Sequence, residues 1–155
     1  MAEAKLLGLF DVKKPVTLSV ATSQHGLGAV LLQNEQPIAY ASRTLTPVQQ
    51  RYAQIEKEMM AIQFGLERFH QYVFGQSLIV ESDHKPLLGI MNKPIAEVSP
   101  RLQRMRLRCL RYQFVLVHKP GKELIIADAL SRAPSKQLYS DHEWMDEEQI
   151  AAVLH

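Results

Sequence analysis

Cysteine is almost absent from this sequence, since Cys109 is the only one among 155 residues. A single cysteine excludes an internal disulfide and a zinc site built from several cysteines, and it favours a reducing compartment. No stretch approaches the roughly 18 consecutive apolar residues that a membrane-spanning helix needs. We therefore expect an intracellular protein without a membrane span.

Glycine and proline are also scarce, with 7 and 8 residues, whereas 46% of the chain is hydrophobic. This composition excludes a disordered chain and allows a single domain with a real core. Residues 1–134 hold 17 of the 18 Lys and Arg and 11 of the 16 Asp and Glu, a net charge of +6. Residues 135–155 have a net charge of −4. We expect one basic domain over 1–134, followed by an acidic tail over 135–155 that is partly helical or disordered.

Short apolar and alternating runs predict five strands, over residues 15–20, 29–33, 37–42, 77–82 and 113–118. Cap-and-proline signals at Thr46-Pro47 and Ser99-Pro100, together with apolar spacings of three and four, predict helices over 46–74 and 101–112. A short final helix is expected over 124–132. The order βββαβαβα predicts an α/β fold with a five-stranded mixed sheet flanked by helices.

Three carboxylates occupy unusual places in this pattern. Glu58 lies beside the apolar stripe of the first long helix, Asp83 follows the strand 77–82, and Asp128 lies in an Ile/Ala/Leu context near the start of the last helix. Each also has a structural explanation: a boundary glutamate reaching solvent, a helix N-cap, and an acid favoured by a helix dipole. If all three converge at one sheet edge, they need hard divalent cations such as Mg²⁺ or Mn²⁺ between them, which is a nuclease-type arrangement.

Five sequence words occur in a characteristic order: TLSVATSQHGLGAVLLQ, PIAYASRTLTPVQQRYAQIEKEMMAI, VESDHKPL, RLQRM and HKPGKELIIADALSR. Together they resemble the ribonuclease H domain of gypsy-type long-terminal-repeat retrotransposon reverse transcriptases. The resemblance covers about residues 9–134 and implies the ribonuclease H-like fold, in agreement with the strand and helix order.

The resemblance also implies an activity. Members of this family are two-metal endonucleases that use four carboxylates to cut the RNA strand of RNA/DNA hybrids during reverse transcription. Glu58, Asp83 and Asp128 match the second, third and fourth carboxylates. The first does not match, because the family motif V-D-A-S reads Val20-Ala21-Thr22-Ser23 here, with Ala21 in place of the aspartate that contacts both metal ions. We therefore expect a weakened ion pair and strongly reduced or absent cleavage.

Two further points about this site stay open in the sequence. A substrate phosphate oxygen and water could fill the gap at Ala21, which would leave residual activity at high metal concentration. His118 precedes Asp128 by ten residues. It is either a proton shuttle near the site or a solvent-facing histidine at a strand end.

Nucleic-acid binding has separate support in the charge pattern. Residues 98–122 contain five Arg, two Lys and no acid, and four of the arginines fall on one stripe of the predicted helix. Such a stripe either contacts phosphates or is merely a solvated face. The predicted nucleic-acid-binding residues are Ser23, Arg101, Arg104, Arg108, Arg111, Lys119 and Lys122.

The implied partners are an RNA/DNA hybrid and the polymerase part of a reverse transcriptase polyprotein, in the cytoplasm, the nucleus or a virus-like particle. The chain itself has no Tyr-x-Asp-Asp string and no multi-cysteine zinc finger. Besides an impaired nuclease, two alternatives remain. One is a noncatalytic module that binds nucleic acid or supports the polymerase, and the other is a structural remnant.

Overall fold

The computed structural model describes residues 5–6 and 8–121. The strands are β1 (Lys5–Leu6), β2 (Thr17–Thr22), β3 (Gly26–Gln33), β4 (Gln36–Thr44), β5 (Ser77–Ser82) and β6 (Gln113–His118). The helices are α1 (Pro47–Gln50), α2 (Gln54–Arg68), α3 (His70–Val73), α4 (Pro86–Asn92), the 3₁₀ helix η1 (Ile95–Glu97) and α5 (Pro100–Cys109). No helix in this described part is long and apolar enough to cross a membrane.

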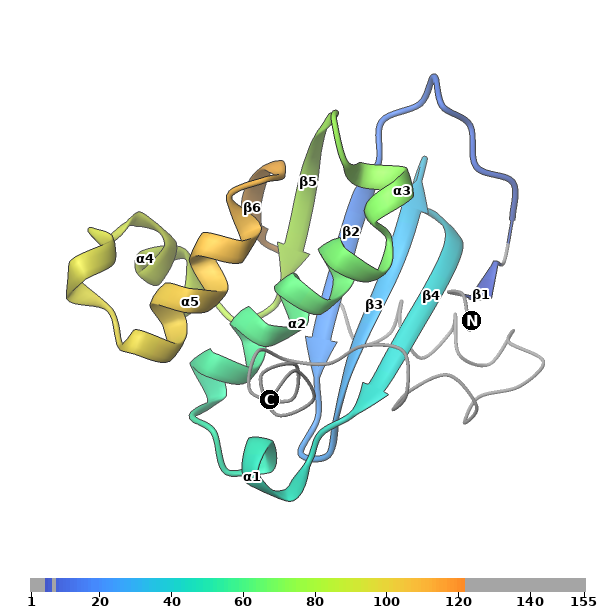
Figure 1. The fold of residues 1–155 in the computed structure, drawn as a ribbon. Coiled ribbons are helices and arrows are strands. Elements are labelled where there is room, and N and C mark those ends of the chain that lie inside the picture. The colour runs from blue at the N-terminus through green and yellow to red at the C-terminus, as the bar shows by residue number, and fades with distance from the viewer. Residues whose placement is uncertain (1–4, 7, 122–155) are drawn as a thin grey trace, which may run out of the picture.

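The strands form one mixed sheet in the order β1-β4-β3-β2-β5-β6 (Figure 1). Strands β2, β3 and β4 form an antiparallel meander, and β5 and β6 then add in parallel on the other side of β2. The β3–β4 turn needs two residues in the left-handed region, and Asn34 (φ 51°) and Glu35 (φ 61°) supply them. The resulting parallel pair β2–β5 lies in the middle of the sheet.

The predicted ribonuclease H-like architecture is confirmed. Strands β2 to β6 are the five predicted strands, and the two-residue β1 adds a short sixth strand beside β4. The observed order from β2 to β6 agrees with the predicted βββαβαβ when each helical segment is counted once. These segments are α1 to α3, between β4 and β5, and α4 to α5, between β5 and β6. The predicted helix over 124–132 and the acidic tail over 135–155 lie outside the described residues.

The prediction of one continuous helix over 46–74 was wrong, because the segment forms α1, α2 and α3. Thr46 caps α1 through the predicted capping box, accepting from the Gln49 backbone N–H at 3.1 Å. A turn follows, and α2 starts anew where the Glu56 carboxylate accepts from the Ala53 N–H at 3.0 Å. Gly75, with φ +84°, follows soon after α3 and marks the end of the helical segment.

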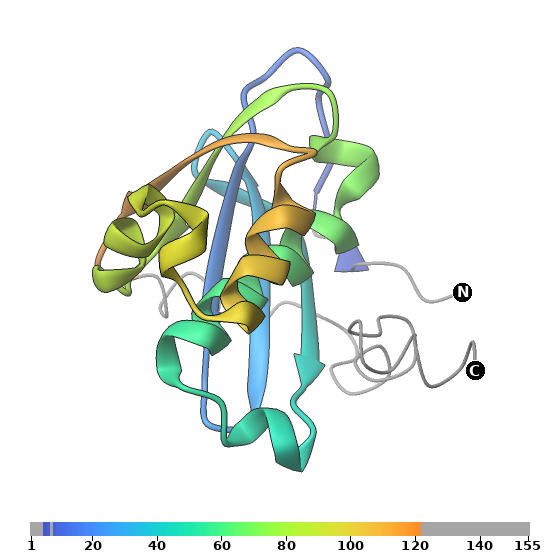
Figure 2. The ribbon, with the colours of Figure 1, turned by 60° about the vertical axis from the view of Figure 1, so that its left-hand side comes forward.

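Helix α2 is the centre of the packing. It lies on one face of the sheet against β2 and β3, with α5 beside it (Figures 1 and 2). Gly65 permits a close approach, because a Cβ atom there would lie 3.0 Å from Leu18 Cδ2 and 3.1 Å from Ala29 Cβ. Helix α2 is therefore buried over most of its length, from Lys57 to Leu66.

Helix α5 begins as predicted, with the Ser99 hydroxyl accepting from the Leu102 N–H at 3.3 Å. The predicted apolar stripe is buried and packs towards α2; it consists of Leu102, Met105, Cys109 and Tyr112. The helix ends at Cys109 rather than at residue 112. Tyr112 is nevertheless buried, with its hydroxyl 2.7 Å from His70 Nδ1.

Candidate active site at the ends of strands β2 and β5

Strands β2 and β5 run parallel, so their carboxyl ends meet at the same edge of the sheet. Their register pairs Leu18 with Val80 and Ser19 with Glu81. Ala21 lies two residues beyond Ser19, and Asp83 lies two residues beyond Glu81, so both positions follow the last paired residues at this edge. Two of the positions that the sequence singled out are thus neighbours at one edge, although they are 62 positions apart in the chain.

Glu58 of α2 reaches the same strand ends. Glu58 is only 3% exposed, so the alternative of a boundary glutamate that reaches solvent is wrong. Its Oε2 accepts hydrogen bonds from Thr22 Oγ1 at 2.7 Å and Gln54 Nε2 at 2.8 Å. Its Oε1 accepts from Ser82 Oγ at 3.3 Å. Burying a carboxylate without hydrogen-bond donors is energetically unfavourable, and here three donors compensate for the lost hydration.

These hydrogen bonds tie the three positions together. Thr22 and Ser82 are the immediate chain neighbours of Ala21 and Asp83. Because both hydroxyls contact the Glu58 carboxylate, α2 is fixed against the ends of β2 and β5 at this point. The structure therefore places Glu58 against the carboxyl ends of β2 and β5, beside the chain neighbours of Ala21 and Asp83. Asp128 lies outside the described residues.

Asp83 and His118 meet at the ends of β5 and β6. His118 Nε2 donates to the Asp83 carbonyl oxygen at 3.1 Å, so the histidine lies beside the candidate site and is exposed. Asp83 is not the N-cap of α4, because that position is held by Lys85. The N-cap explanation of Asp83 is therefore wrong. The role of His118 as a proton shuttle remains a prediction.

The sequence reasoning missed the three donors to Glu58. Gln54 precedes Glu58 by four residues on α2, a spacing that places both side chains on one helix face. Gln54 Nε2 also donates to Thr22 Oγ1 at 2.7 Å. The signal for Thr22 was its place in Val20-Ala21-Thr22-Ser23, where it stands in the position that the motif V-D-A-S gives to alanine.

The described residues do not fit a two-ion centre. Ala21 offers a methyl group instead of an oxygen, and both Glu58 oxygens already accept hydrogen bonds from protein donors. Among residues 5–6 and 8–121, no group of three or more His, Cys, Asp and Glu is placed to hold a metal ion. Two carboxylates, one of them engaged by three donors, are fewer than hard divalent cations require.

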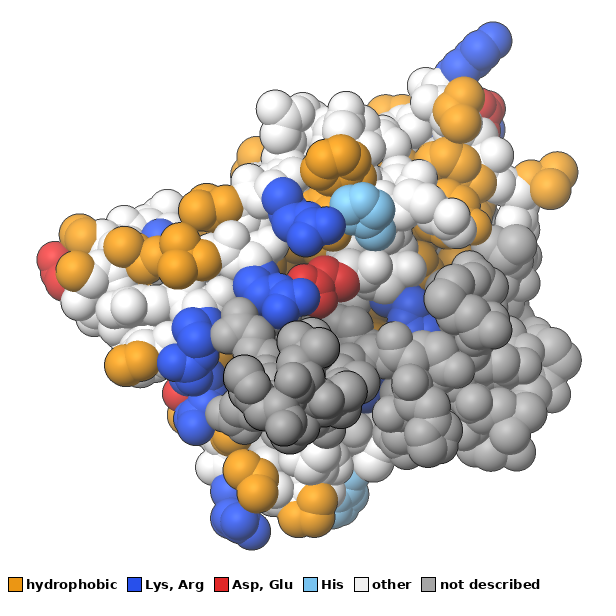
Figure 3. All heavy atoms as spheres, viewed as in Figure 1, with side chains coloured by type: hydrophobic (Ala, Val, Ile, Leu, Met, Phe, Trp, Pro, Cys, Tyr) orange, Lys and Arg blue, Asp and Glu red, His pale blue; other side chains and the backbone are white. Residues whose placement is uncertain are grey.

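The arginine stripe of α5 is partly paired within the protein. Arg101 stacks on the Tyr52 ring, with its guanidinium carbon 3.8 Å from the ring centroid, and it pairs with Glu56 at 3.2 Å. Arg108 pairs with Glu67 at 2.9 Å. Figure 3 shows Lys and Arg side chains gathered on the face of α2 and α5, with an acidic side chain among them.

Arg104 and Arg111 are the two exposed members of the predicted stripe, but Arg111 lies beyond the end of α5. The stripe thus presents less uncompensated charge than the sequence indicated. Salt bridges at such half-exposed positions are weak, so a phosphate can compete for these arginines.

Ser23 and Lys119, two of the three remaining predicted nucleic-acid contacts, also have partners in the protein. Ser23 lies in the β2–β3 turn, where its hydroxyl accepts from the Gly26 N–H at 3.1 Å. Lys119 reaches Glu81 at 3.4 Å and Glu35 at 3.8 Å. Lys122 lies outside the described residues. These contacts leave the nucleic-acid roles of the three residues as predictions.

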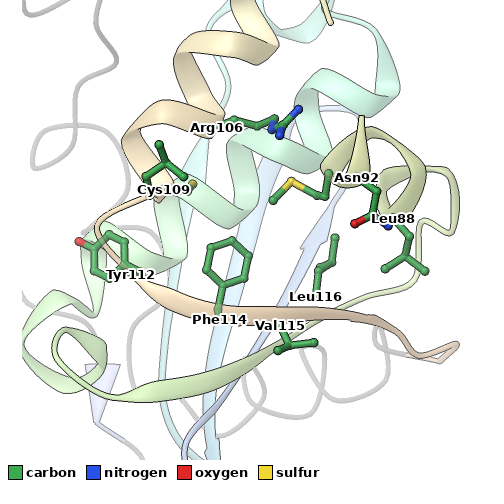
Figure 4. A pocket seen from close by; sticks show the side chains of 10 residues that line it. Leu88, Asn92, Arg106, Cys109, Tyr112, Phe114, Val115 and Leu116 are labelled. Carbon is green, nitrogen blue, oxygen red and sulfur yellow. The ribbon is translucent and has the colours of Figure 1, made fainter. Parts of the chain in front are cut away.

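A separate pocket opens between α4, α5 and β6 (Figure 4). Its lining is largely apolar, with Leu88 from α4 and Phe114 and Leu116 from β6, and Arg106 and Asn92 at its polar side. Its lining includes neither Glu58 nor Asp83, so the pocket is distinct from the candidate active site.

Comparison with known proteins identifies the family. The family described as "RNase H-like domain found in reverse transcriptase" matches residues 11–112. The chain is 41% identical over 127 residues to the retrovirus-related Pol polyprotein from transposon 297 of Drosophila melanogaster, covering 82% of this chain and 12% of that protein. It is 35% identical over 133 residues to the corresponding polyprotein of transposon gypsy from the same organism, covering 84% of this chain and 13% of that protein. The chain thus spans about an eighth of the length of these relatives.

Solved structures agree on the fold. The foamy viral protease-reverse transcriptase in complex with RNA/DNA hybrid superposes with a TM-score of 0.60 at 16% identity, covering 88% of this chain and 18% of that one. The ribonuclease H1 from Halobacterium salinarum NRC-1 superposes with a TM-score of 0.50 at 18% identity, covering 77% of this chain and 99% of that one. Family match, relatives and fold agree: the chain belongs to the RNase H-like domain family of retrotransposon reverse transcriptases.

Proposed function

We propose that this domain descends from a nuclease that cleaves the RNA strand of RNA/DNA hybrids, and that its own cleavage is strongly impaired because it binds Mg²⁺ or Mn²⁺ poorly. Ala21 carries this proposal. It stands at the end of β2, at the same sheet edge as Asp83, in the position where the family motif has an aspartate. The methyl group supplies neither a ligand oxygen nor a negative charge.

A nucleic-acid duplex is the proposed partner, and its binding is electrostatic. The support is the basic face of α2 and α5 together with the fold relationship to a foamy viral enzyme solved with an RNA/DNA hybrid. Because Arg101 and Arg108 are paired with Glu56 and Glu67, we expect weak binding that falls steeply as salt rises.

A noncatalytic role beside a polymerase is the second candidate. The relatives are Pol polyproteins of which this chain matches only 12% and 13%, so a domain of this kind occurs within much longer proteins. A domain whose metal site is lost but whose core is intact can still serve as such a structural part. In that case, removing the domain would impair the adjoining polymerase, whereas blocking hybrid cleavage would not.

Hybrid cleavage is the decisive experiment. A labelled RNA/DNA hybrid is incubated with the chain and with its Ala21→Asp variant, each with Mg²⁺ and with Mn²⁺. We expect cleavage at or near background by the unchanged chain and measurable cleavage by Ala21→Asp. Comparable cleavage by both proteins would contradict the proposed impairment.

A matched control shows that any regained cleavage comes from this site. Adding Asp83→Asn to the Ala21→Asp variant exchanges one oxygen for an amide at nearly constant volume, so the fold is retained while a candidate ligand is lost. We expect cleavage to return to background. If cleavage persists in this double variant, the activity does not arise at the ends of β2 and β5.

A further inference from the structure

The Glu58 carboxylate takes part in a hydrogen-bond network that fills three of its four acceptor sites. A carboxylate has about four acceptor sites, two on each oxygen. Thr22 and Gln54 fill the two sites of Oε2, at 2.7 and 2.8 Å, and Ser82 fills one site of Oε1 at 3.3 Å. Oε2 therefore has no lone pair left to bind a metal ion.

Thr22 is the central donor of this network. Its hydroxyl has one proton, and the group accepts a hydrogen bond from Gln54 Nε2 at 2.7 Å. Because Gln54 donates to Thr22, the Thr22 proton is directed to Glu58. Thr22, Gln54 and Glu58 thus form a closed triangle, with members from β2 and α2, whose contacts are all between 2.7 and 2.8 Å.

Ala21 and Thr22 are adjacent and affect the same site in the same direction. Ala21 removes a ligand and a negative charge, and Thr22 supplies a donor that compensates the remaining charge of Glu58. A protein donor on Oε2 competes with a cation for the same lone pair. The missing carboxylate at position 21 and the hydroxyl at position 22 therefore both act against metal binding at the same strand end.

We propose that Thr22 is a positioning residue that holds Glu58 in a conformation suited to a site without metal ions, so that restoring an aspartate at position 21 alone restores metal binding only in part. The inference rests on the proposed function, since it treats the ends of β2 and β5 as a former metal site. It adds that Glu58 offers a cation only the remaining site of Oε1 until a second residue changes. Partners of this kind, which orient a metal ligand, alter metal affinity by roughly 10–100-fold.

The test compares Mn²⁺ binding by four variants of the full chain, measured by the electron paramagnetic resonance signal of free Mn²⁺. The variants are Ala21→Asp alone and Ala21→Asp combined with Thr22→Val, Thr22→Ser or Gln54→Ala. Valine has the shape of threonine without its hydroxyl and suits a strand, whereas serine keeps the donor. We expect Thr22→Val to bind Mn²⁺ about tenfold more tightly than Ala21→Asp alone, and Thr22→Ser to match Ala21→Asp.

The Gln54→Ala combination keeps the test decisive if the valine variant folds poorly, because Gln54 is exposed and also donates to Oε2. We expect it to tighten Mn²⁺ binding as well. Equal affinity in Ala21→Asp and in both combinations that remove a donor would overturn the inference, as would the absence of Mn²⁺ binding in all four variants.

Hybrid cleavage by the same variants separates this inference from the proposed function. If the donor-deleted variants bind Mn²⁺ more tightly but none of the four cleaves the hybrid, the role of Thr22 stands, and the proposal that Ala21 accounts for the impaired cleavage fails. If all variants with Asp at position 21 cleave and bind Mn²⁺ equally, the proposed function stands and the role of Thr22 is wrong.

Discussion

Two glycine-to-alanine substitutions should change the stability of this domain in opposite directions. Gly65 lies in α2 and Gly89 lies in α4. In the interior of a helix, alanine is favoured over glycine by about 1 kcal/mol, so helix propensity stabilises both variants by the same amount. Any difference between them comes from the surroundings of the new methyl group.

The surroundings differ sharply. A Cβ atom on Gly65 would lie 3.0 and 3.2 Å from the two Cδ atoms of Leu18 and 3.1 Å from Ala29 Cβ, whereas a Cβ atom on Gly89 has nothing within 4 Å. Leu18 is fully buried, so its side chain has to shift within the core to admit the methyl group, and overpacking of this kind costs typically 1–3 kcal/mol. We expect Gly89→Ala to raise the free energy of unfolding by about 1 kcal/mol and Gly65→Ala to lower it by 0 to about 2 kcal/mol.

Urea unfolding followed by far-ultraviolet circular dichroism measures both values. The difference between the two variants equals the packing cost, about 1–3 kcal/mol, which corresponds to roughly 2–4 °C in Tm per kcal/mol for a chain of this size. The slope of the free energy against urea should stay unchanged, because neither variant alters the exposed surface much. If both variants raise the midpoint equally, α2 does not approach β2 and β3 as closely as described.

Two further outcomes follow from the caps and the core. Thr46→Ala should lower the free energy of unfolding by about 1 kcal/mol because the first turn of α1 loses its cap, whereas Thr46→Ser should be nearly neutral. Burial raises the pKa of the Cys109 thiol well above its ordinary value. The unfolded chain therefore releases the thiol proton from about pH 8.5 upward while the folded chain keeps it, so stability should fall with rising pH by up to about 1.4 kcal/mol per unit. Urea titrations between pH 8 and 9.5 should show this slope in the native chain and lose it in Cys109→Ala; an equal slope in both would contradict the burial of the thiol.

The strands and the helix starts were predictable because their signals are local. The ranges 77–82 and 113–118 are the observed bounds of β5 and β6. Thr46 and Ser99 cap helices as their cap-and-proline patterns indicated. The break before α2 was not predictable, because Ala53 is not a cap residue and the apolar period continues across the turn. Strand β1 was missed because two residues carry no periodicity.

The sequence predicted two residues of the site but not the hydrogen bonds that they make. The apolar surroundings of Glu58 and the position of Asp83 after a strand pointed to these two residues. The donors to Glu58 come from β2 and β5 as well as α2, so only tertiary structure brings them together. The uncompensated charge of the arginine stripe was overestimated for the same reason. Glu56 and Glu67, which pair with Arg101 and Arg108, belong to a different helix.

The sheet edge that Ala21 shares with Asp83 has a consequence for the domain without metal ions. Two carboxylates side by side repel each other unless a cation separates them. A site with aspartates at both positions is therefore destabilised when no metal ion is bound. An alanine at one of the two positions, as at Ala21, removes that repulsion. With alanine at position 21, the ends of β2 and β5 therefore need no cation between two such carboxylates.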